Sequence, residues 1–379
     1  MISFAFTEEQ EEFRRGLARF AQDELKPGYR ERASRTDFPW DIQRRLGSMG
    51  VLGIGLPEEY GGTGFEDPIL LGLAAETLAE GDVNVASAPV QVGLIGSQLA
   101  LGSQAVRQEY LAPLIRGECT VAIALTEPGA GSDAAALRTI AEPAPGGWRL
   151  RGEKTAISWA MNAVAALVYA RAPATTRSSG VSCFLVPLDA PGVSRAPTLG
   201  MGCLPLGWGS INLDGAFVSQ DALIGEEGSG FAGVMHHFDF SRPALGLLCL
   251  GAAHASLEEA LSFATEREAF GQPIFNFQGV QFPLAEQATY LEAARWLCYR
   301  ALWLRATGQP HTGVASMGKW WPPVVAKDAI EASMKIHGHL GYSTELPLQQ
   351  RLRDVMAYLV ADGTAEIQKR VIARDLVSR

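Results

Sequence analysis

The stretch LTEPGAGSD, residues 125–133, lies where the character of the sequence changes. Before it, apolar side chains recur at the 3.6-residue spacing of helices; after it, Gly and Pro become frequent and short β-rich runs follow one another. Helical spacing returns near residue 228 and continues towards the C-terminus. Helices, then strands, then helices predict an α+β chain of three domains: helices over residues 1–120, a small β-sandwich or barrel over 121–228, and helices over 229–379.

Local signals place the first elements. Thr7 and Gln10 form a capping-box pattern ahead of a helix that Pro27 ends. Further helices are predicted from Pro39, over 68–79 and over 90–114. Strands are predicted over 120–125, 148–151, 163–170, 182–186 and 211–217.

The glycines of the opening stretch also match the GxGxxA pattern of dinucleotide-binding turns, with Glu153 at about the distance of a ribose-binding acid. A Rossmann fold is disfavoured because residues 126–128 separate the preceding strand from the glycines. No alternating αβ pattern follows them either. By themselves, the glycines are equally consistent with a surface turn that binds no ligand.

Composition excludes several classes of protein. Hydrophobic residues make up 47% and charged residues 19% of the chain, which is enough to bury a large core. The net charge of −9 argues against nucleic-acid and membrane-surface partners. The most apolar helical run, residues 245–255, is predicted to be too short to span a bilayer, and the first residues show no signal peptide.

The cysteines and histidines do not suggest a metal site. The five cysteines are widely spaced without a CxxC pair, which favours reduced thiols in a cytoplasmic protein over disulfides or zinc. The histidine pairs 236/237 and 337/339 lack the i, i+4 spacing that places two ligands on one helix face. We therefore expect no metal.

Four motifs in order make the sequence resemble the acyl-CoA dehydrogenase family over essentially its whole length. They are LTEPGAGSD (125–133), EREAFGQPI with FQ (266–274 and 277–278), HGHLGY (337–342) and DGTAEIQ (362–368). The resemblance implies an N-terminal helical domain, a middle β-domain, a C-terminal four-helix bundle and bound FAD. It also implies a homotetramer, an acyl-CoA or acyl-carrier-protein substrate, and electron-transfer flavoprotein as acceptor.

Residues that match the family's cofactor contacts lie in all four motifs. Arg267, Phe270 and Gln278 match residues that reach the FAD of a neighbouring subunit, and the planar fork of Arg267 suits a pyrophosphate. Thr364 and Glu366 open the last helix, where free N–H groups favour phosphate. The cofactor-binding residues implied by the resemblance are Leu125, Thr126, Gly131, Ser132, Ser158, Arg267, Phe270, Gln278, Lys335, Gly338, Thr364 and Glu366.

The implied reaction is α,β-dehydrogenation of an acyl thioester. A carboxylate removes the α-proton while the β-hydrogen leaves as hydride to flavin N5, and hydrogen bonds to the thioester carbonyl stabilise the developing enolate. The family's usual glutamate base matches Asp362, and the other family location for a base holds Ser241, which cannot serve. The substrate-binding residues implied by the resemblance are Ser132, Phe238, Asp239, Arg242 and Gly363.

Aspartate is one methylene shorter than the usual base, and a shift of ~1 Å can cost ~100-fold in rate. Two family branches carry aspartate here: dehydrogenases of cyclohexane-carboxyl-CoA, and nitroalkane oxidase. The segment FDFSR (238–242) and Ser132 favour a CoA thioester, so a ring or branched acyl group is the first hypothesis. Ala361, in place of an aromatic residue, widens the same corner. A non-catalytic flavoprotein is the third hypothesis, which Asp362 disfavours.

Other positions depart from the family pattern. Ala156 removes an aromatic side chain expected near the flavin, and Trp159 is a candidate to fill that space. Lys335 replaces a glutamine and could meet the pyrophosphate as a point charge. His339 replaces a glycine.

Overall fold

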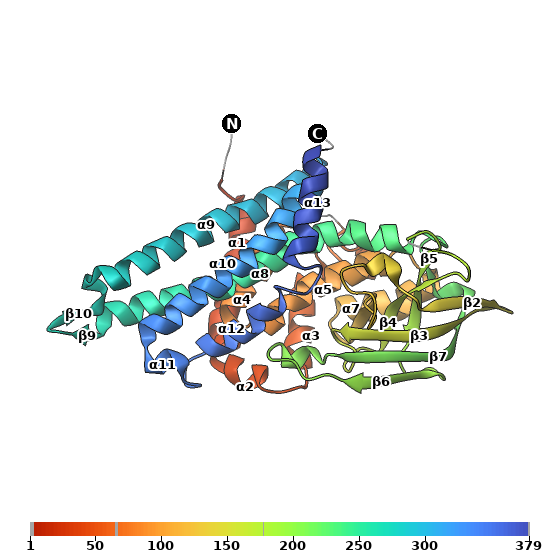
Figure 1. Cartoon of the computed structure of the whole chain (residues 1–379), viewed down its shortest axis with the longest axis horizontal. Helices are drawn as coiled ribbons and strands as arrows, with labels where there is room; N and C mark the ends of the chain where they lie inside the picture. The colour runs from red at the N-terminus through yellow and green to blue at the C-terminus, as the bar shows by residue number, and fades with distance from the viewer. Residues whose placement is uncertain (1–3, 65–66, 177, 378–379) are drawn as a thin grey trace.

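The computed structural model describes residues 4–64, 67–176 and 178–377. Residues 1–3, part of the segment in which no signal peptide is expected, lie outside that description. The molecule is elongated: the sheet forms one end and a hairpin on the long C-terminal helices forms the other (Figure 1). The predicted boundaries fall directly before β1 and next to the start of α8, in the segments that connect the three regions.

The N-terminal region is helical. Its helices are α1 (Glu8–Phe20), α2 (Tyr29–Ala33), α3 (Trp40–Ser48), α4 (Pro68–Gly81), α5 (Val83–Leu99), α6 (Gln104–Val106) and α7 (Ala112–Ile115). The capping box is confirmed, since Thr7 and Gln10 bond to each other's backbone N–H at the start of α1. The helix predicted over 90–114 is wrong at both ends. Asp82 accepts hydrogen bonds from the N–H groups of Asn84 and Val85 and so starts α5 early, and a turn after Leu99 ends it.

The middle region is a sheet of eight strands. They are β1 (Val121–Ala124), β2 (Ile140–Ala144), β3 (Gly147–Ile157), β4 (Ala165–Arg171), β5 (Val181–Pro187), β6 (Val193–Pro197), β7 (Gly209–Ser219) and β8 (Leu223–Ile224). Their order is β6-β7-β3-β2-β4-β5-β8, and β1 pairs in parallel with β4. A single pair, Ile140 opposite Arg171, joins β2 to β4 and so divides the sheet into two parts. β4 and β5 are buried along nearly their whole length, which places the core against them.

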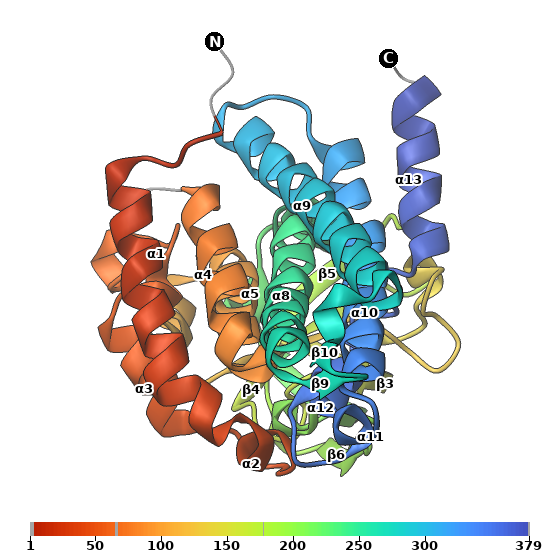
Figure 2. The ribbon, with the colours of Figure 1, turned by 90° about the vertical axis from the view of Figure 1, so that its left-hand side faces the viewer.

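The C-terminal region consists of α8 (Gly230–Glu266), α9 (Gln278–Ala306), α10 (Thr312–His337), α11 (His339–Tyr342), α12 (Leu348–Ala357) and α13 (Ala365–Val377), with the hairpin β9 (Glu268–Ala269) and β10 (Gln272–Pro273). α8, α9 and α10 run side by side, and α13 projects from one end of them (Figure 2). α8 approaches α10 closely because Gly246 has no side chain: a Cβ there would lie 2.2 Å from the Gly318 carbonyl oxygen.

α8 is longer than the sequence suggests. It has 37 residues, and its most apolar 18-residue window has a mean hydropathy of 1.2, so length and composition alone would allow it to cross a membrane. The prediction that this apolar run is too short is therefore wrong as a statement about length. In the structure 72% of that window is buried, as expected for the core helix of the bundle.

One buried carboxylate joins the three regions. Asp354 on α12 accepts hydrogen bonds from Tyr29 Oη at 2.7 Å, Asn84 Nδ2 at 3.1 Å and Cys203 N at 2.6 Å. Gln350 Nε2 adds a fourth at 2.9 Å. Because these donors come from the N-terminal helices, the middle region and α12, Asp354 fixes how the regions pack around the segment that follows α12.

Candidate active site

The signature loop follows β1 and is held from behind by an ion pair. Glu127 accepts hydrogen bonds from the N–H groups of Arg138 (2.6 Å) and Thr139 (2.9 Å), from Thr139 Oγ1 (2.6 Å) and from Lys154 Nζ (2.8 Å). Lys154 is fully buried and also donates to the Leu125 carbonyl at 3.1 Å. Although burial raises the pKa of Glu127, Lys154 and the other donors hold it below its usual range. Burial lowers the pKa of Lys154 to about 8, so both groups are charged at neutral pH.

The loop presents polar groups outward. The Thr126 carbonyl accepts a hydrogen bond from Thr155 N at 2.9 Å, which ties the loop to β3 shortly before Ser158. Thr126 and Ser158 are half-buried and Ser132 is exposed. Within the described part of the chain, none of these three hydroxyl groups has a hydrogen-bond partner, so all three are available to a ligand.

The segment after β3 has an unusual backbone. Ala156 (φ 54°) and Trp159 (φ 70°) both have left-handed conformations that side chains other than glycine rarely adopt. Trp159 is only 1% exposed and packs edge-on against Phe38 of the N-terminal region, with ring centroids 4.4 Å apart. Trp159 is thus a core residue between two regions, and this contact explains its position independently of any cofactor. Strain of this kind often marks a functional segment.

The predicted base lies in the turn between α12 and α13. Asp362 has φ 52°, a conformation that aspartate tolerates better than most residues, and Gly363 follows with φ 93°. Gln368 on α13 fixes this turn, because its Nε2 donates to the carbonyls of Asp362 (3.0 Å) and Gly363 (3.3 Å). The Asp362 carboxylate itself receives no hydrogen bond from the described residues, so it is available to accept a proton.

Two cations from neighbouring helices act on this carboxylate. Burial raises the pKa of Asp362, and the charges of Lys319 on α10 and Arg242 on α8 partly oppose that rise. Arg242 is 5% exposed and donates from Nη1 to Asp239 at 2.6 Å, and Asp239 accepts a second hydrogen bond from Thr312 Oγ1 at 2.6 Å. Phe238 is buried below the Arg242 guanidinium. The structure therefore brings Arg242 and Asp362 into one electrostatic environment.

Another set of predicted residues lies at the far end of the bundle. Arg267, Phe270 and Gln278 surround the β9–β10 hairpin, at the opposite end of the molecule from the sheet (Figure 1). The Phe270 side chain is 95% exposed and its backbone has φ 53°. The Arg267 guanidinium is exposed and makes no ion pair with any residue in the described ranges. One chain therefore does not bring these residues to Thr126.

Two further predicted cofactor-binding residues, Lys335 and Gly338, lie at the C-terminal end of α10. Lys335 is 73% exposed and pairs with Glu331 at 2.6 Å, the ordinary i, i+4 pair of a helix surface. Gly338 has φ 61°, and a Cβ there would meet no atom within 4 Å, so its conformation rather than its size requires glycine.

The start of α13 is less suited to phosphate than predicted. Hydrogen bonds from its own backbone N–H and from Thr364 lower the pKa of the exposed Glu366. This carboxylate already uses the helix N-terminus and would repel a second anion there. Thr126, Ser132, Ser158 and Arg267 have polar groups without a partner in the described residues, whereas the Glu366 carboxylate is bound within the chain; their contact with FAD stays a prediction.

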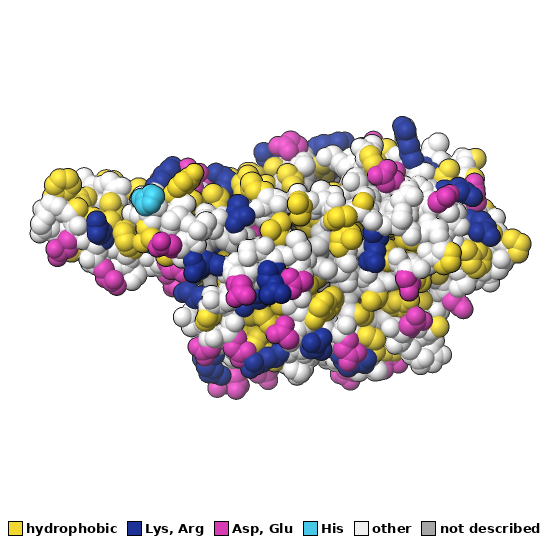
Figure 3. Space-filling view, turned by 90° about the horizontal axis from the view of Figure 1, so that it is seen from below, with side chains coloured by type: hydrophobic (Ala, Val, Ile, Leu, Met, Phe, Trp, Pro, Cys, Tyr) yellow, Lys and Arg dark blue, Asp and Glu magenta, His cyan; other side chains and the backbone are white. Residues whose placement is uncertain are grey.

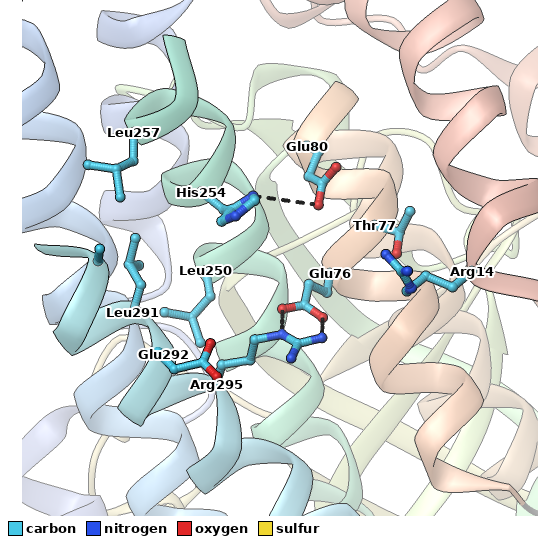
Figure 4. Close-up of a pocket in the computed structure, with 11 residues that line it drawn as sticks. Arg14, Glu76, Thr77, Glu80, Leu250, His254, Leu257, Leu291, Glu292 and Arg295 are labelled. Atoms are coloured by element: carbon cyan, nitrogen blue, oxygen red, sulfur yellow. Dashed lines mark hydrogen bonds and ion pairs between the residues drawn. The ribbon is translucent and has the colours of Figure 1, made fainter. Parts of the chain in front are cut away.

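A cavity of about 400 Å³ lies elsewhere, between α1, α4, α8 and α9 (Figure 4). Arg295 on α9 forms a two-bond ion pair with Glu76 on α4, and Glu80 faces His254 on α8 at 3.9 Å. Burial raises the pKa of Glu80 to about 7; His254 opposes this rise, and Glu76 adds to it. None of the residues that line this cavity is a predicted site residue, and its charged groups largely partner one another.

Sequence comparison decides the family. The chain matches three sequence profiles in order: "Acyl-CoA dehydrogenase, N-terminal domain" over residues 7–118, "middle domain" over 122–216 and "C-terminal domain" over 228–377. The chain belongs to the acyl-CoA dehydrogenase family. It is therefore an FAD-dependent oxidoreductase that acts on acyl-CoA.

Individual relatives agree with the family over the full length. The chain is 34% identical to a 3-(aryl)acrylate reductase of Clostridium sporogenes, covering 98% of this chain and 100% of the relative. It is also 34% identical to benzylmalonyl-CoA dehydrogenase of Aromatoleum aromaticum, with complete coverage of both. Among solved structures, butyryl-CoA dehydrogenase of Megasphaera elsdenii superposes with a TM-score of 0.94 at 30% identity, covering 99% and 100%. A structure of PigA with FAD and proline gives 0.95 at 26%, covering 99% of each.

The sequence reasoning missed several residues of this acyl-CoA dehydrogenase site. Glu127 lies within the first motif but has no role in the prediction, and the sequence analysis predicts no role for Lys154 or Lys319. Lys319 lies in the mostly apolar run 314–321, which is a weak sign of a buried cation, whereas Lys154 lies in the polar segment RGEKT (151–155), which gives no such sign. The tertiary contacts alone identify these pairs.

Proposed function

We propose that this acyl-CoA dehydrogenase oxidises a ring or branched acyl thioester of CoA, with Asp362 as the base. The single observation that carries the proposal is the state of Asp362: a half-buried residue whose carboxylate has no hydrogen-bond donor in the described residues and whose pKa is acted on by the charges of Lys319 and Arg242. Burial moves its pKa upward, towards the range in which a carboxylate is an effective general base near neutral pH. Bound FAD supplies the hydride acceptor.

The choice of a ring substrate rests on the corner beside the base. Ala361 and Asp362 are both smaller than the residues usual in the family, and the turn that carries them is fixed by Gln368. Two relatives at 34% identity are named for aryl or benzyl substrates, which supports a ring in this pocket. A shorter base suits an α-carbon that a ring brings nearer to the turn.

The placement of the cofactor residues supports an assembly. Thr126, Ser132 and Ser158 lie at the sheet end, whereas Arg267, Phe270 and Gln278 lie at the hairpin end of the same chain (Figure 1). If the hairpin of a second copy packed against the sheet of the first, the two groups of cofactor residues would lie together and the exposed Phe270 ring would be covered. We propose a homotetramer built from such pairs, cytoplasmic, with electron-transfer flavoprotein as acceptor.

Anaerobic reduction of the bound flavin tests the function. Purified protein is titrated with cyclohexane-carboxyl-CoA, butyryl-CoA and nitroethane while the flavin absorbance is followed. Bleaching by the ring thioester in the native protein, with a loss of ~100-fold or more in Asp362→Asn, supports the proposal. Bleaching by nitroethane alone would assign the chain to the oxidase branch. The absence of bleaching by any of them in flavin-loaded protein would refute the ring-substrate proposal.

A further inference from the structure

Lys319 is a buried cation that the reaction itself does not require. It lies on α10, is 1% exposed, and donates a hydrogen bond from Nζ to the Tyr358 carbonyl at 2.8 Å. Tyr358 is the first residue after α12, four positions before Asp362. A charge taken out of water costs several kcal/mol unless a counter-charge compensates it. An ammonium group has three donors, and a backbone carbonyl satisfies only one of them.

The charges around Lys319 indicate what compensates it. Burial lowers the pKa of Lys319, the Asp362 carboxylate and the Cys249 thiol act to raise it, and Arg242 acts to lower it. The charges of Lys319 and Arg242 in turn act to lower the pKa of Asp362, and the charge of Asp362 acts to raise the pKa of the buried Tyr358 hydroxyl. Among the described groups whose charges act on Lys319, only Asp362 is normally an anion at neutral pH.

We propose that Lys319 is a positioning residue for the base: its hydrogen bond to the Tyr358 carbonyl fixes the start of the turn, and its charge keeps the Asp362 carboxylate ionised. Gln368 holds the other end of the turn through the Asp362 and Gly363 carbonyls. The turn is thus fixed at both ends by side chains, and only Lys319 adds a charge. This inference rests on the proposed function, in which Asp362 is the base.

Three substitutions separate the hydrogen bond from the charge. Lys319→Gln keeps a donor for the carbonyl and removes the charge, Lys319→Arg keeps both, and Lys319→Met removes both. Lys327→Met is the matched control, since Lys327 lies on the same helix but pairs with Asp328 and Glu331 at the surface. Circular dichroism and thermal melting confirm that each variant is folded before use; Lys319→Gln, the milder change, serves alone where Lys319→Met does not fold.

The first measurement is the pH profile of anaerobic flavin reduction by cyclohexane-carboxyl-CoA. The rate falls at low pH as the base becomes protonated, so a base that has lost its counter-charge shows this fall at higher pH. We expect the acid limb to move up by about one pH unit in Lys319→Gln and Lys319→Met, a roughly tenfold loss at a fixed pH on that limb. Lys319→Arg and Lys327→Met should keep the native limb. A merely structural lysine would change the rate or the melting temperature without moving the limb.

The second measurement does not depend on turnover. Infrared difference spectra record protonation of the Asp362 carboxyl during a pH titration, with Asp362→Asn as the blank. The same upward shift is expected in Lys319→Gln. If Asp362 in Lys319→Gln becomes protonated at the same pH as in the native protein, the inference is overturned even if the variant is active. If no acyl-CoA reduces the native flavin, the proposed function fails, and the infrared titration still decides whether Lys319 keeps Asp362 ionised.

Discussion

Removal of the lysine behind the signature loop should destabilise the middle region and loosen its cofactor contacts. Lys154 and Glu127 form an ion pair in which the two side chains are 0% and 7% exposed. In Lys154→Met the methionine fills most of the vacated volume, but it leaves the Glu127 carboxylate without a cation and the Leu125 carbonyl without its Nζ donor.

The expected loss of stability in Lys154→Met depends on the hydrogen bonds that Glu127 keeps in the variant. Loss of one partner from a buried ion pair costs about 3–5 kcal/mol. Glu127 retains the N–H groups of Arg138 and Thr139 and the Thr139 hydroxyl, so we expect the lower end, about 3 kcal/mol. With an unfolding entropy of about 2.1 cal/mol/K per residue, the melting temperature should fall by about 4 °C if the chain unfolds as one unit.

A double-mutant cycle identifies the pair as the cause. Lys154→Met with Glu127→Gln removes both charges and leaves a neutral amide among the remaining groups. The double variant should therefore be less destabilised than the sum of the single variants, by about 2 kcal/mol. The surface control Arg35→Met, which loses only exposed ion pairs with Asp37 and Glu31, should change stability by less than about 0.5 kcal/mol.

Thermal melting followed by far-UV circular dichroism gives the stability, and the fluorescence of released flavin gives the temperature at which the cofactor leaves. We expect flavin release to shift at least as far as the unfolding transition in Lys154→Met, because Thr126 and Ser132 lie in the loop that Glu127 holds. A Lys154→Met protein as stable as the native one, or strictly additive effects in the cycle, would refute this account of the loop.

Asp362→Glu should lower kcat/KM for cyclohexane-carboxyl-CoA relative to butyryl-CoA, because the longer side chain crowds the α-carbon and glutamate tolerates φ 52° less well than aspartate; an unchanged preference argues against the ring substrate. Arg267→Ala should lose FAD in a flavin-content assay while it keeps its helical circular dichroism, and a fully flavin-loaded monomer in sedimentation would contradict the shared site. Asp354→Ala should cost about 3–5 kcal/mol in thermal or urea unfolding, since four buried donors lose their acceptor; a loss below about 1 kcal/mol would show that the regions pack independently of it. Glu80→Gln should raise stability at pH 8 and change it little at pH 4. The folded-state pKa of Glu80, about 7, lies above the unfolded value, so the native protein loses stability as the pH rises from about 4.5 to 7. Because the Glu80 side chain is 39% exposed, we expect Glu80→Gln to gain only about 1 kcal/mol at pH 8. Equal stabilities of the two proteins at pH 8 would show that burial does not destabilise the Glu80 carboxylate.

The sequence alone predicts elements whose signals are local. The capping box at Thr7 and Gln10 needs only residues three positions apart, and the strand around 163–170 needs only an unbroken apolar run. The four ordered motifs predict the family because each of them is contiguous in the chain. The start predicted for the helix over 90–114 is wrong because a cap sets the true start. Asp82 accepts hydrogen bonds from two N–H groups and begins the helix before the apolar pattern.

The residues that control the site lie beyond such local signals. The motifs identify Asp362 as the candidate base, but its environment depends on other elements. Lys319 on α10 and Arg242 on α8, whose charges act on its pKa, lie 43 and 120 positions away in the sequence. Lys154 lies 27 residues from Glu127, and Asp354 lies 325 residues from Tyr29. The free energy of a buried charge depends on which groups the fold brings within a few ångströms, and residue order does not specify those distances. The sequence thus determined the family, the order of the three regions and the candidate base of this protein, whereas only the tertiary structure decided which buried charges compensate one another around them.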